Sequence, residues 1–257
     1  MASPSGRFLW YDLMTTDMAA AAAFYREVVG WDARDSGMPD RSYSIFSMGA
    51  TAVAGLMPIP DDLLAAGIPP CWSGYVGVAD VDDYADRVEG AGGTIRKPPT
   101  DIPGIGRYSV VADPYGAVFI LFKGSSAQGP EPAAPGAPGH IGWHELHAGE
   151  GEGAFAFYSK LFGWSPAEAH DMGPMGKYQT FAAGGAPLGG MMTRMPDSPG
   201  PFWAYYFNVD GIDAAKSRVE RSGGRVLNGP MEVPGGLWVL QAIDPQGAFF
   251  ALLAPRR

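Results

Sequence analysis

Two carboxylates each follow a tryptophan by two residues. Asp12 lies two residues after Trp10, and Glu145 lies two residues after Trp143. Side chains two apart on a strand point to the same side, so each acid shares a face with its tryptophan. Burial beside an aromatic ring raises the pKa of a carboxyl group, which suits a general base or acid. The same face carries His147 after Glu145. We therefore predict three catalytic residues: Glu145, His147 and Asp12.

A second interpretation of the acids is architectural. A half-buried carboxylate needs a hydrogen-bond or charge partner, and backbone or indole N–H groups could supply one. Asp12 and Glu145 would then hold the two parts of a module together instead of doing chemistry. The residues alone leave both interpretations open.

Strand alternation places further apolar and aromatic side chains on the faces of the two acids. We predict that these side chains bind substrate: Trp10, Met14, Met57 and Tyr75 in the first half, and Trp143, Met192, Tyr206, Asn208 and Phe249 in the second. This composition is typical of a pocket for an aromatic small molecule, and also of an ordinary core. The second set is more polar, so if a single site works we expect it there.

The chain repeats itself. Residues 10–31 match 143–164 at an offset of 133, residues 43–57 match 178–192 at 135, and the segment from Cys71 onward matches at 131. Between the copies lies GSSAQGPEPAAPGAP, a composition that forms an extended linker rather than a core. We predict a first module over residues 1–123, a linker over 124–138 and a second module over 139–257.

Within the first module, Gly and Pro residues separate short segments. We expect strands over 10–14, 75–78 and 118–122, a helix that begins at Asp17 and ends at Gly30, and a second helix over 81–89. The order is βαβββ, twice per module. The fold class is therefore α+β.

These features resemble the vicinal oxygen chelate superfamily, which includes glyoxalases, bleomycin-resistance proteins and extradiol dioxygenases. Three patterns carry the resemblance in both halves: an acid followed by Phe-Tyr and Gly-Trp, a helix that ends before Gly-Gly, and Asp-Pro-x-Gly before the last strand. In this sequence they are Asp17, Phe24, Tyr25, Gly30, Trp31 and Asp113–Gly116, with Glu150, Phe157, Tyr158, Gly163, Trp164 and Asp244–Gly247. More narrowly, the chain resembles tandem glyoxalase-like proteins of the actinobacterial "hydroxylase" and secreted-antigen type. The resemblance implies that each module forms a curved, incompletely closed mixed sheet around a cavity.

The resemblance also implies a divalent metal held by His or Gln and Glu side chains on four strands. The corresponding positions are Trp10, Gly55, Ser73 and Ile120, then Trp143, Gly190, Ala204 and Ala251. None is a competent ligand beyond a weak serine. Among the histidines, His144 and His147 would point to opposite faces of a strand. We predict no metal and no cofactor.

Composition excludes several function classes. The formal net charge is -9 and no basic cluster appears, so a nucleic-acid partner is not expected. No apolar run is long enough for a membrane helix. Cys71 is the single cysteine and the N-terminus lacks a signal-peptide core, which favours the cytoplasm. Because the tandem supplies its own partner surface, we expect a monomer.

The sequence therefore predicts a metal-independent protein that acts on a planar or aromatic small molecule, by lyase, isomerase or cofactor-independent oxygenase chemistry in natural-product metabolism. One alternative is a resistance protein that sequesters an antibiotic by stacking, without chemistry. A second alternative is a metal-dependent glyoxalase or dioxygenase.

Overall fold

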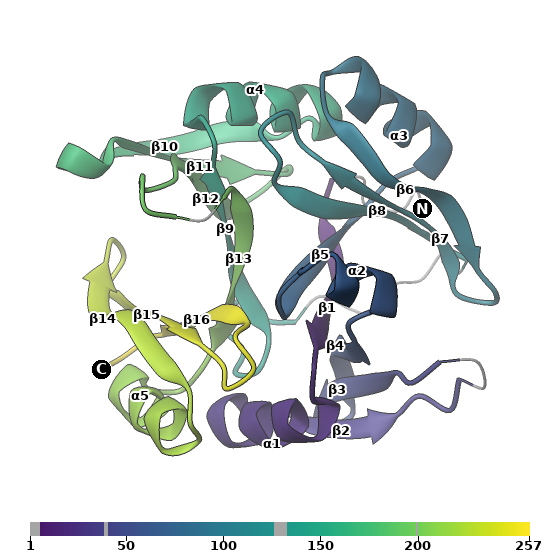
Figure 1. Cartoon of the computed structure of the whole chain (residues 1–257). Coiled ribbons are helices and arrows are strands. Elements are labelled where there is room, and N and C mark those ends of the chain that lie inside the picture. Colours follow the sequence, from purple (N-terminus) through teal and green to yellow (C-terminus); the bar gives the residue numbers. More distant parts are fainter. Residues whose placement is uncertain (1–5, 39–40, 126–132, 199) are drawn as a thin grey trace. The chain divides into compact units, whose positions relative to one another are not determined.

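The computed structural model describes residues 6–38, 41–125, 133–198 and 200–257. These residues form two eight-stranded mixed sheets, one from each half of the sequence (Figure 1). The first has the order β2-β3-β4-β1-β5-β8-β7-β6 and the second β10-β11-β12-β9-β13-β16-β15-β14. The strands of the first sheet are β1 (Phe8–Thr15), β2 (Asp32–Asp35), β3 (Ser44–Met48), β4 (Thr51–Pro58), β5 (Cys71–Gly77), β6 (Thr94–Ile102), β7 (Gly106–Ala112) and β8 (Val118–Gly124). Those of the second are β9 (Ile141–Ala148), β10 (Ser165–Asp171), β11 (Lys177–Ala182), β12 (Pro187–Thr193), β13 (Phe202–Asn208), β14 (Arg225–Val233), β15 (Leu237–Ile243) and β16 (Phe249–Ala254).

The helices complete the repeated βαβββ order. They are α1 (Met18–Val29), α2 (Asp61–Ala65), α3 (Val81–Gly90), α4 (Gly151–Phe162), α5 (Ile212–Arg221) and a 3₁₀ turn, η1 (Gly173–Met175). The predicted α+β class with two βαβββ units in each tandem module is confirmed. The short helix α2 and the turn η1 were not expected from the sequence.

The chain folds into two compact units that divide it differently from the two sheets. Unit 1 contains α3, β6, β7 and β8 together with α4, β10, β11 and β12. Unit 2 contains α1, β2, β3, β4 and α2 together with α5, β14, β15 and β16. The division falls after Leu9, Trp72, Trp143 and Trp203, inside four of the strands. Each unit thus combines one βαβββ segment from each half of the sequence.

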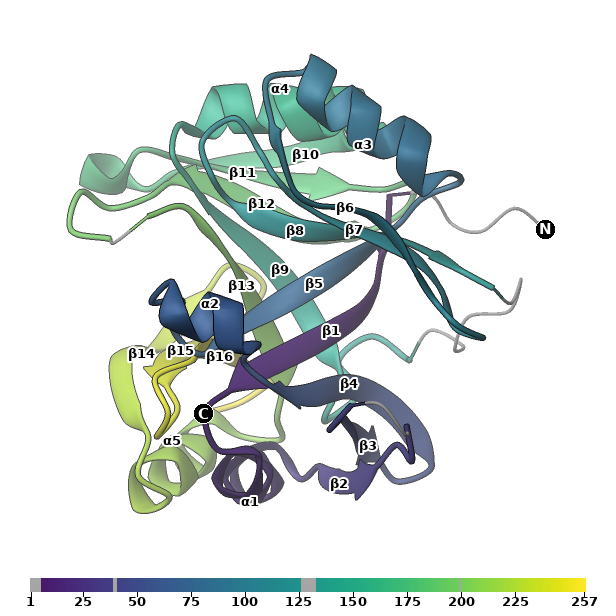
Figure 2. The ribbon, with the colours of Figure 1, turned by 45° about the vertical axis from the view of Figure 1, so that its right-hand side comes forward.

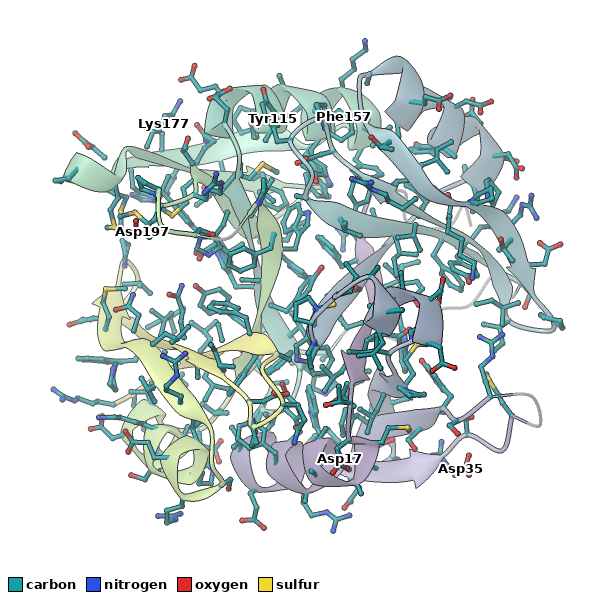
Figure 3. All side chains as sticks on the ribbon, viewed as in Figure 1. Asp17, Asp35, Tyr115, Phe157, Lys177 and Asp197 are labelled. Carbon is teal, nitrogen blue, oxygen red and sulfur yellow. The ribbon has the colours of Figure 1, made fainter. Side chains whose placement is uncertain are left out.

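The long helices of the first βαβββ segments begin and end where the sequence predicts. The side chain of Asp17, which is labelled in Figure 3, accepts a hydrogen bond from the backbone N–H of Ala20 at the start of α1. Glu150 caps α4 in the same way. Gly30 and Gly163 end the two helices at positive φ, 92° and 72°, which side-chain-bearing residues rarely adopt. The acid and glycine of the repeated pattern are therefore helix caps.

In unit 2, α1 packs beside α5 (Figure 2). Phe24, Tyr25 and Trp31 of the repeated pattern are buried there. The indole of Trp72 donates to the hydroxyl of Tyr25 at 2.8 Å, and Tyr25 donates to the carboxylate of Asp244 at 3.2 Å. Trp31 donates to the carbonyl of Gly139. Burial raises the pKa of the Asp244 carboxyl above its usual value. These contacts join the first half of the sequence to the second.

Unit 1 repeats the arrangement with the halves exchanged. Trp203 donates to Tyr158 at 3.1 Å, and Tyr158 donates to Asp113 at 3.3 Å. The other oxygen of Asp113 accepts the backbone N–H groups of Tyr115 and Ala117, which shapes the Asp-Pro-x-Gly turn. We call each Trp–Tyr–Asp chain a buried relay. The aromatic residues of the repeated pattern and the aspartates of the two Asp-Pro-x-Gly turns are therefore buried structural residues, whereas the first acid and the glycine cap a helix.

Candidate functional site

Glu145 lies on β9 in unit 1 and both of its carboxylate oxygens have polar neighbours. Oε1 lies 2.9 Å from Nε2 of His147, and Oε2 accepts a hydrogen bond of 3.0 Å from the hydroxyl of Tyr178. The side chains of Glu145 and His147 are 11% and 14% exposed, so the pair is largely shielded from water. We call Glu145, His147 and Tyr178 the Glu145 cluster.

Apolar groups fix the position of the imidazole. The ring of His147 stacks on Phe202 with centroids 4.5 Å apart and planes 7° from parallel. Met192 on β12 is the register partner of His147, and Gly190 is the register partner of Glu145. A planar aromatic surface thus adjoins a carboxylate, an arrangement suited to orienting a flat ligand.

Tyr178 reaches Glu145 by crossing the strand between them. In the second sheet β12 lies between β11, which carries Tyr178, and β9, which carries Glu145. A Cβ atom at Gly190 would collide with the ring and hydroxyl of Tyr178. The absence of a side chain at Gly190 is therefore what lets the phenol pass over β12.

Unit 2 contains a counterpart on β1. The hydroxyl of Tyr43 donates to Oδ1 of Asp12 at 2.7 Å, and the indole of Trp10 donates to the same oxygen at 2.9 Å. Gly55 on β4 is the register partner of Asp12, and a Cβ there would collide with Tyr43 and Asp12. We call Trp10, Asp12 and Tyr43 the Asp12 cluster.

Each cluster contains an acid and a tyrosine, but the third member is His147 in unit 1 and Trp10 in unit 2. Burial, together with the charge of Asp12, raises the pKa of Tyr43 well above its usual range, so its proton stays in place. An indole N–H only donates, whereas an imidazole can accept and release a proton near neutral pH. The Asp12 cluster therefore matches the architectural interpretation, while the Glu145 cluster has the groups needed for proton transfer.

The remaining predicted binding residues lie in both units. Met14 and Met57 are register partners, and Tyr75 packs edge-on against Phe122. The hydroxyl of Tyr206 accepts a hydrogen bond from Gln241, and the amide of Asn208 donates to the carbonyl of Ala137. Trp143 on β9 and Phe249 on β16 are partly buried. The structure brings Glu145 and His147 together and Trp10 and Asp12 together; a binding role for the others stays a prediction.

His144 has a different environment from His147. Its ring stacks on Phe8 with centroids 4.2 Å apart, and Nδ1 lies 2.7 Å from the carbonyl oxygen of Leu188. Burial lowers the pKa of His144 to about 4. Its Phe8 and Leu188 contacts contrast with the Glu145 and Phe202 contacts of His147, as their odd separation on the strand predicts.

The side chains do not fit the metal site that the resemblance implies. Within the described ranges, no group of three or more His, Cys, Asp or Glu side chains could hold a metal ion. Two of the eight implied ligand positions, Gly55 and Gly190, lie beside acids but are crossed by tyrosines. Transition metals need imidazole, thiolate or carboxylate donors, which these eight positions lack.

Sequence reasoning missed Tyr43 and Tyr178. A signal was present, because the middle repeat begins with a tyrosine in both copies and carries a glycine twelve residues later. The pairing of each tyrosine with an acid depends on strand order, which the repeat by itself does not reveal.

Comparison with known proteins agrees with this fold. The sequence profile of the Glyoxalase/Bleomycin resistance protein/Dioxygenase superfamily matches residues 7–121 and 139–252. The chain belongs to this superfamily. Solved structures with the same fold include the 2,3-dioxygenase LapB from Pseudomonas sp. KL28, with a TM-score of 0.67 and 13% identity over 98% of this chain and 93% of that one. The Mn(II)-bound glyoxalase from Novosphingobium aromaticivorans has a TM-score of 0.65 and 16% identity over 99% and 83%.

Two relatives are similar over almost their whole length. "Putative glyoxylase CFP32" of Mycobacterium tuberculosis (strain CDC 1551 / Oshkosh) is 35% identical, covering 96% of this chain and 94% of the relative. "Anthracycline biosynthesis protein DnrV" of Streptomyces peucetius is 32% identical, covering 96% and 92%. In the part of the chain that the structure describes, no helix is long and apolar enough to cross a membrane.

Proposed function

We propose that this protein transfers a proton on a planar or aromatic small molecule without a metal, and that the Glu145 cluster is the reacting site. The observation that carries the proposal is the shielded carboxylate with an imidazole nitrogen 2.9 Å from one oxygen and a phenol 3.0 Å from the other. Such a group can remove a proton and pass it on, which is the work of a general base.

In the proposed step, Glu145 removes a proton from a carbon beside a carbonyl group. The electron pair of the C–H bond moves onto the carbonyl oxygen and forms an enolate. In this step a neutral His147 carries its proton on Nδ1. Its Nε2 takes up the proton across the 2.9 Å contact, and Nδ1 then releases a proton to a different atom of the substrate. No electrons are gained or lost, so the net reaction is an isomerisation, or an elimination if a leaving group departs.

An anthracycline is the first probe to try, because the relative DnrV is named an anthracycline biosynthesis protein. Its flat, fused rings would match the stacked surface of His147 and Phe202. We extend the proposal to the other residues predicted to bind substrate: Trp10, Met14, Met57, Tyr75, Trp143, Met192, Tyr206, Asn208 and Phe249. A monomer in the cytoplasm remains part of the proposal.

The test compares Glu145→Gln with Asp12→Asn. We expect Glu145→Gln to lower turnover about 10²- to 10⁴-fold with little loss of stability, because it removes the base and keeps the shape. Asp12→Asn should instead cost about 1–3 kcal/mol of stability, since it weakens two buried hydrogen bonds. Turnover is followed by chromatography and mass spectrometry of the anthracycline, binding by its fluorescence, and stability by denaturant unfolding.

Glu168→Gln serves as the control because this carboxylate on β10 is 79% exposed. Equal losses of stability with unchanged ligand behaviour in both test variants would make both acids architectural. Tight binding without any turnover in the wild type would favour a sequestering protein. Turnover that appears only after a divalent metal is added would favour a metal-dependent glyoxalase or dioxygenase.

A further inference from the structure

Gly55 and Gly190 are both crossed by a tyrosine side chain. Both lie at positions where the family resemblance implies a metal ligand. Gly55 and Gly190 are equivalent in the two repeats, and each is the register partner of an acid on the neighbouring strand. At both places the volume of a β4 or β12 side chain is occupied by a tyrosine. A tyrosine hydroxyl has thus taken the place of a side chain from the middle strand.

In unit 1, the tyrosine that occupies the space at Gly190 contacts a carboxylate with a second polar neighbour. Tyr178 donates to Oε2 of Glu145, and His147 lies at Oε1. Gly190 on β12 offers no polar side chain to the carboxylate. Tyr178 is therefore the donor that fixes the second oxygen, while the first lies 2.9 Å from the imidazole nitrogen.

We propose that Tyr178 is a positioning residue that holds the Glu145 carboxylate ionised and aimed at His147, through the opening left at Gly190. The inference rests on the proposed function only in naming Glu145 as the reacting group. A hydrogen bond to the charged form of a carboxyl favours that form, and donors to a charged group are worth more than neutral pairs.

Unit 2 supplies a matched control. Tyr43 crosses Gly55 and donates to Asp12 in the same way, but the third member there is Trp10, which cannot accept a proton. Changes at Tyr43 and Gly55 should therefore disturb only their own carboxylate.

Two different substitutions should remove the Tyr178 hydrogen bond. Tyr178→Phe deletes the hydroxyl. Gly190→Ala keeps the hydroxyl but places a methyl group where the phenol ring lies. Among the described glycines, Gly190 is not one with positive φ, so alanine fits the backbone and only the space is at issue. Agreement between the two variants separates the hydrogen bond from other effects of either change.

The readout is the carboxyl carbon-13 NMR signal of Glu145 at pH 7.5, in protein labelled at the glutamate side-chain carboxyls and assigned by its loss in Glu145→Gln. We expect the signal to move in the same direction in Tyr178→Phe and Gly190→Ala, and to stay in place in Tyr43→Phe and Gly55→Ala. Anthracycline turnover should fall about tenfold in the first two variants, as expected for one hydrogen bond to a charged group.

An unmoved Glu145 signal in Tyr178→Phe and Gly190→Ala would overturn the inference, as would an equal movement in Tyr43→Phe. If the signal moves as expected but Glu145→Gln turns over the anthracycline normally, the positioning role stands and the proposed function fails. If Glu145→Gln abolishes turnover while Tyr178→Phe leaves the signal and turnover unchanged, the proposed function stands and the positioning role fails.

Discussion

At the scale of single residues, two histidines that lie three positions apart on β9 have different surroundings. His144 packs against Phe8 with a carbonyl oxygen at Nδ1, whereas His147 adjoins a carboxylate. A buried imidazole resists protonation, because its charge would lose solvation. The contribution of His144 to the free energy of unfolding therefore depends on pH.

We expect His144 to make the folded state acid-sensitive. Its folded pKa of about 4 lies below the unfolded value of 6.5, so the folded state disfavours the proton. The stabilisation is present above pH 6.5 and is lost as pH falls towards 4. Between pH 7 and pH 4.5 the wild type should lose about 2–3 kcal/mol more than His144→Gln.

Urea unfolding at half-unit pH steps measures this difference. Subtracting the two curves is necessary because Asp113 and Asp244, whose pKa values burial raises, titrate in the same acidic range with the opposite sign. Parallel curves for the wild type and His144→Gln would contradict the prediction.

The candidate site was only partly predictable at this scale. The two-residue spacing of Glu145 and His147 predicts a shared face, and in the structure Oε1 of Glu145 lies 2.9 Å from Nε2 of His147. Tyr178 could not be assigned to Glu145, because its contact depends on a three-strand order and on a missing Cβ in the middle strand. Periodicity reveals which face a residue occupies, but not which distant side chain reaches it.

At the scale of elements, the buried relays connect helices to strands. Tyr25 on α1 accepts from Trp72 and donates to Asp244, and Tyr158 on α4 stands between Trp203 and Asp113 in the same way. Each hydroxyl satisfies two buried polar groups at once. Removing it leaves an indole N–H and a carboxylate oxygen each short of one partner.

We expect Tyr25→Phe and Tyr158→Phe each to destabilise the protein by about 2–4 kcal/mol, because two buried groups lose a hydrogen bond. The ring of Tyr108 on β7 lies under Lys97 on β6, and Tyr108→Phe should change stability by less than about 0.5 kcal/mol. Guanidinium unfolding measures all three. Losses below about 1 kcal/mol in both relay variants would show that water or other groups replace the hydroxyl.

Element order and helix ends followed from the sequence for specific reasons. Asp17 and Gly30 have side-chain and backbone properties that act locally, so their positions bound α1 correctly. The partner of Tyr25 was not foreseeable, since Asp244 lies more than two hundred residues away. Local capping is encoded in a few neighbouring residues, whereas packing partners emerge from the whole fold.

At the scale of the whole molecule, the chemistry of the available donor groups argues against the metal ion that the family resemblance implies. We expect the purified protein to carry well under one equivalent of transition metal, and EDTA to leave its melting temperature unchanged. The reason is that the implied ligand positions hold Trp, Gly, Ser, Ile and Ala, which do not compete with water for such ions. Plasma mass spectrometry and thermal unfolding with and without EDTA measure this, and stoichiometric zinc, nickel or iron would contradict it.

The exchange of residues between halves has a consequence for how this gene can change. The relay of unit 2 takes Tyr25 from the first copy and Asp244 from the second, and the relay of unit 1 does the reverse with Tyr158 and Asp113. Recombination between the two copies would yield a gene with a single repeat, in which the tyrosine and the acid belong to different units, so that only a second molecule could complete the relay. Loss of one copy would therefore make folding depend on the association of two chains, whereas the tandem completes both relays within one.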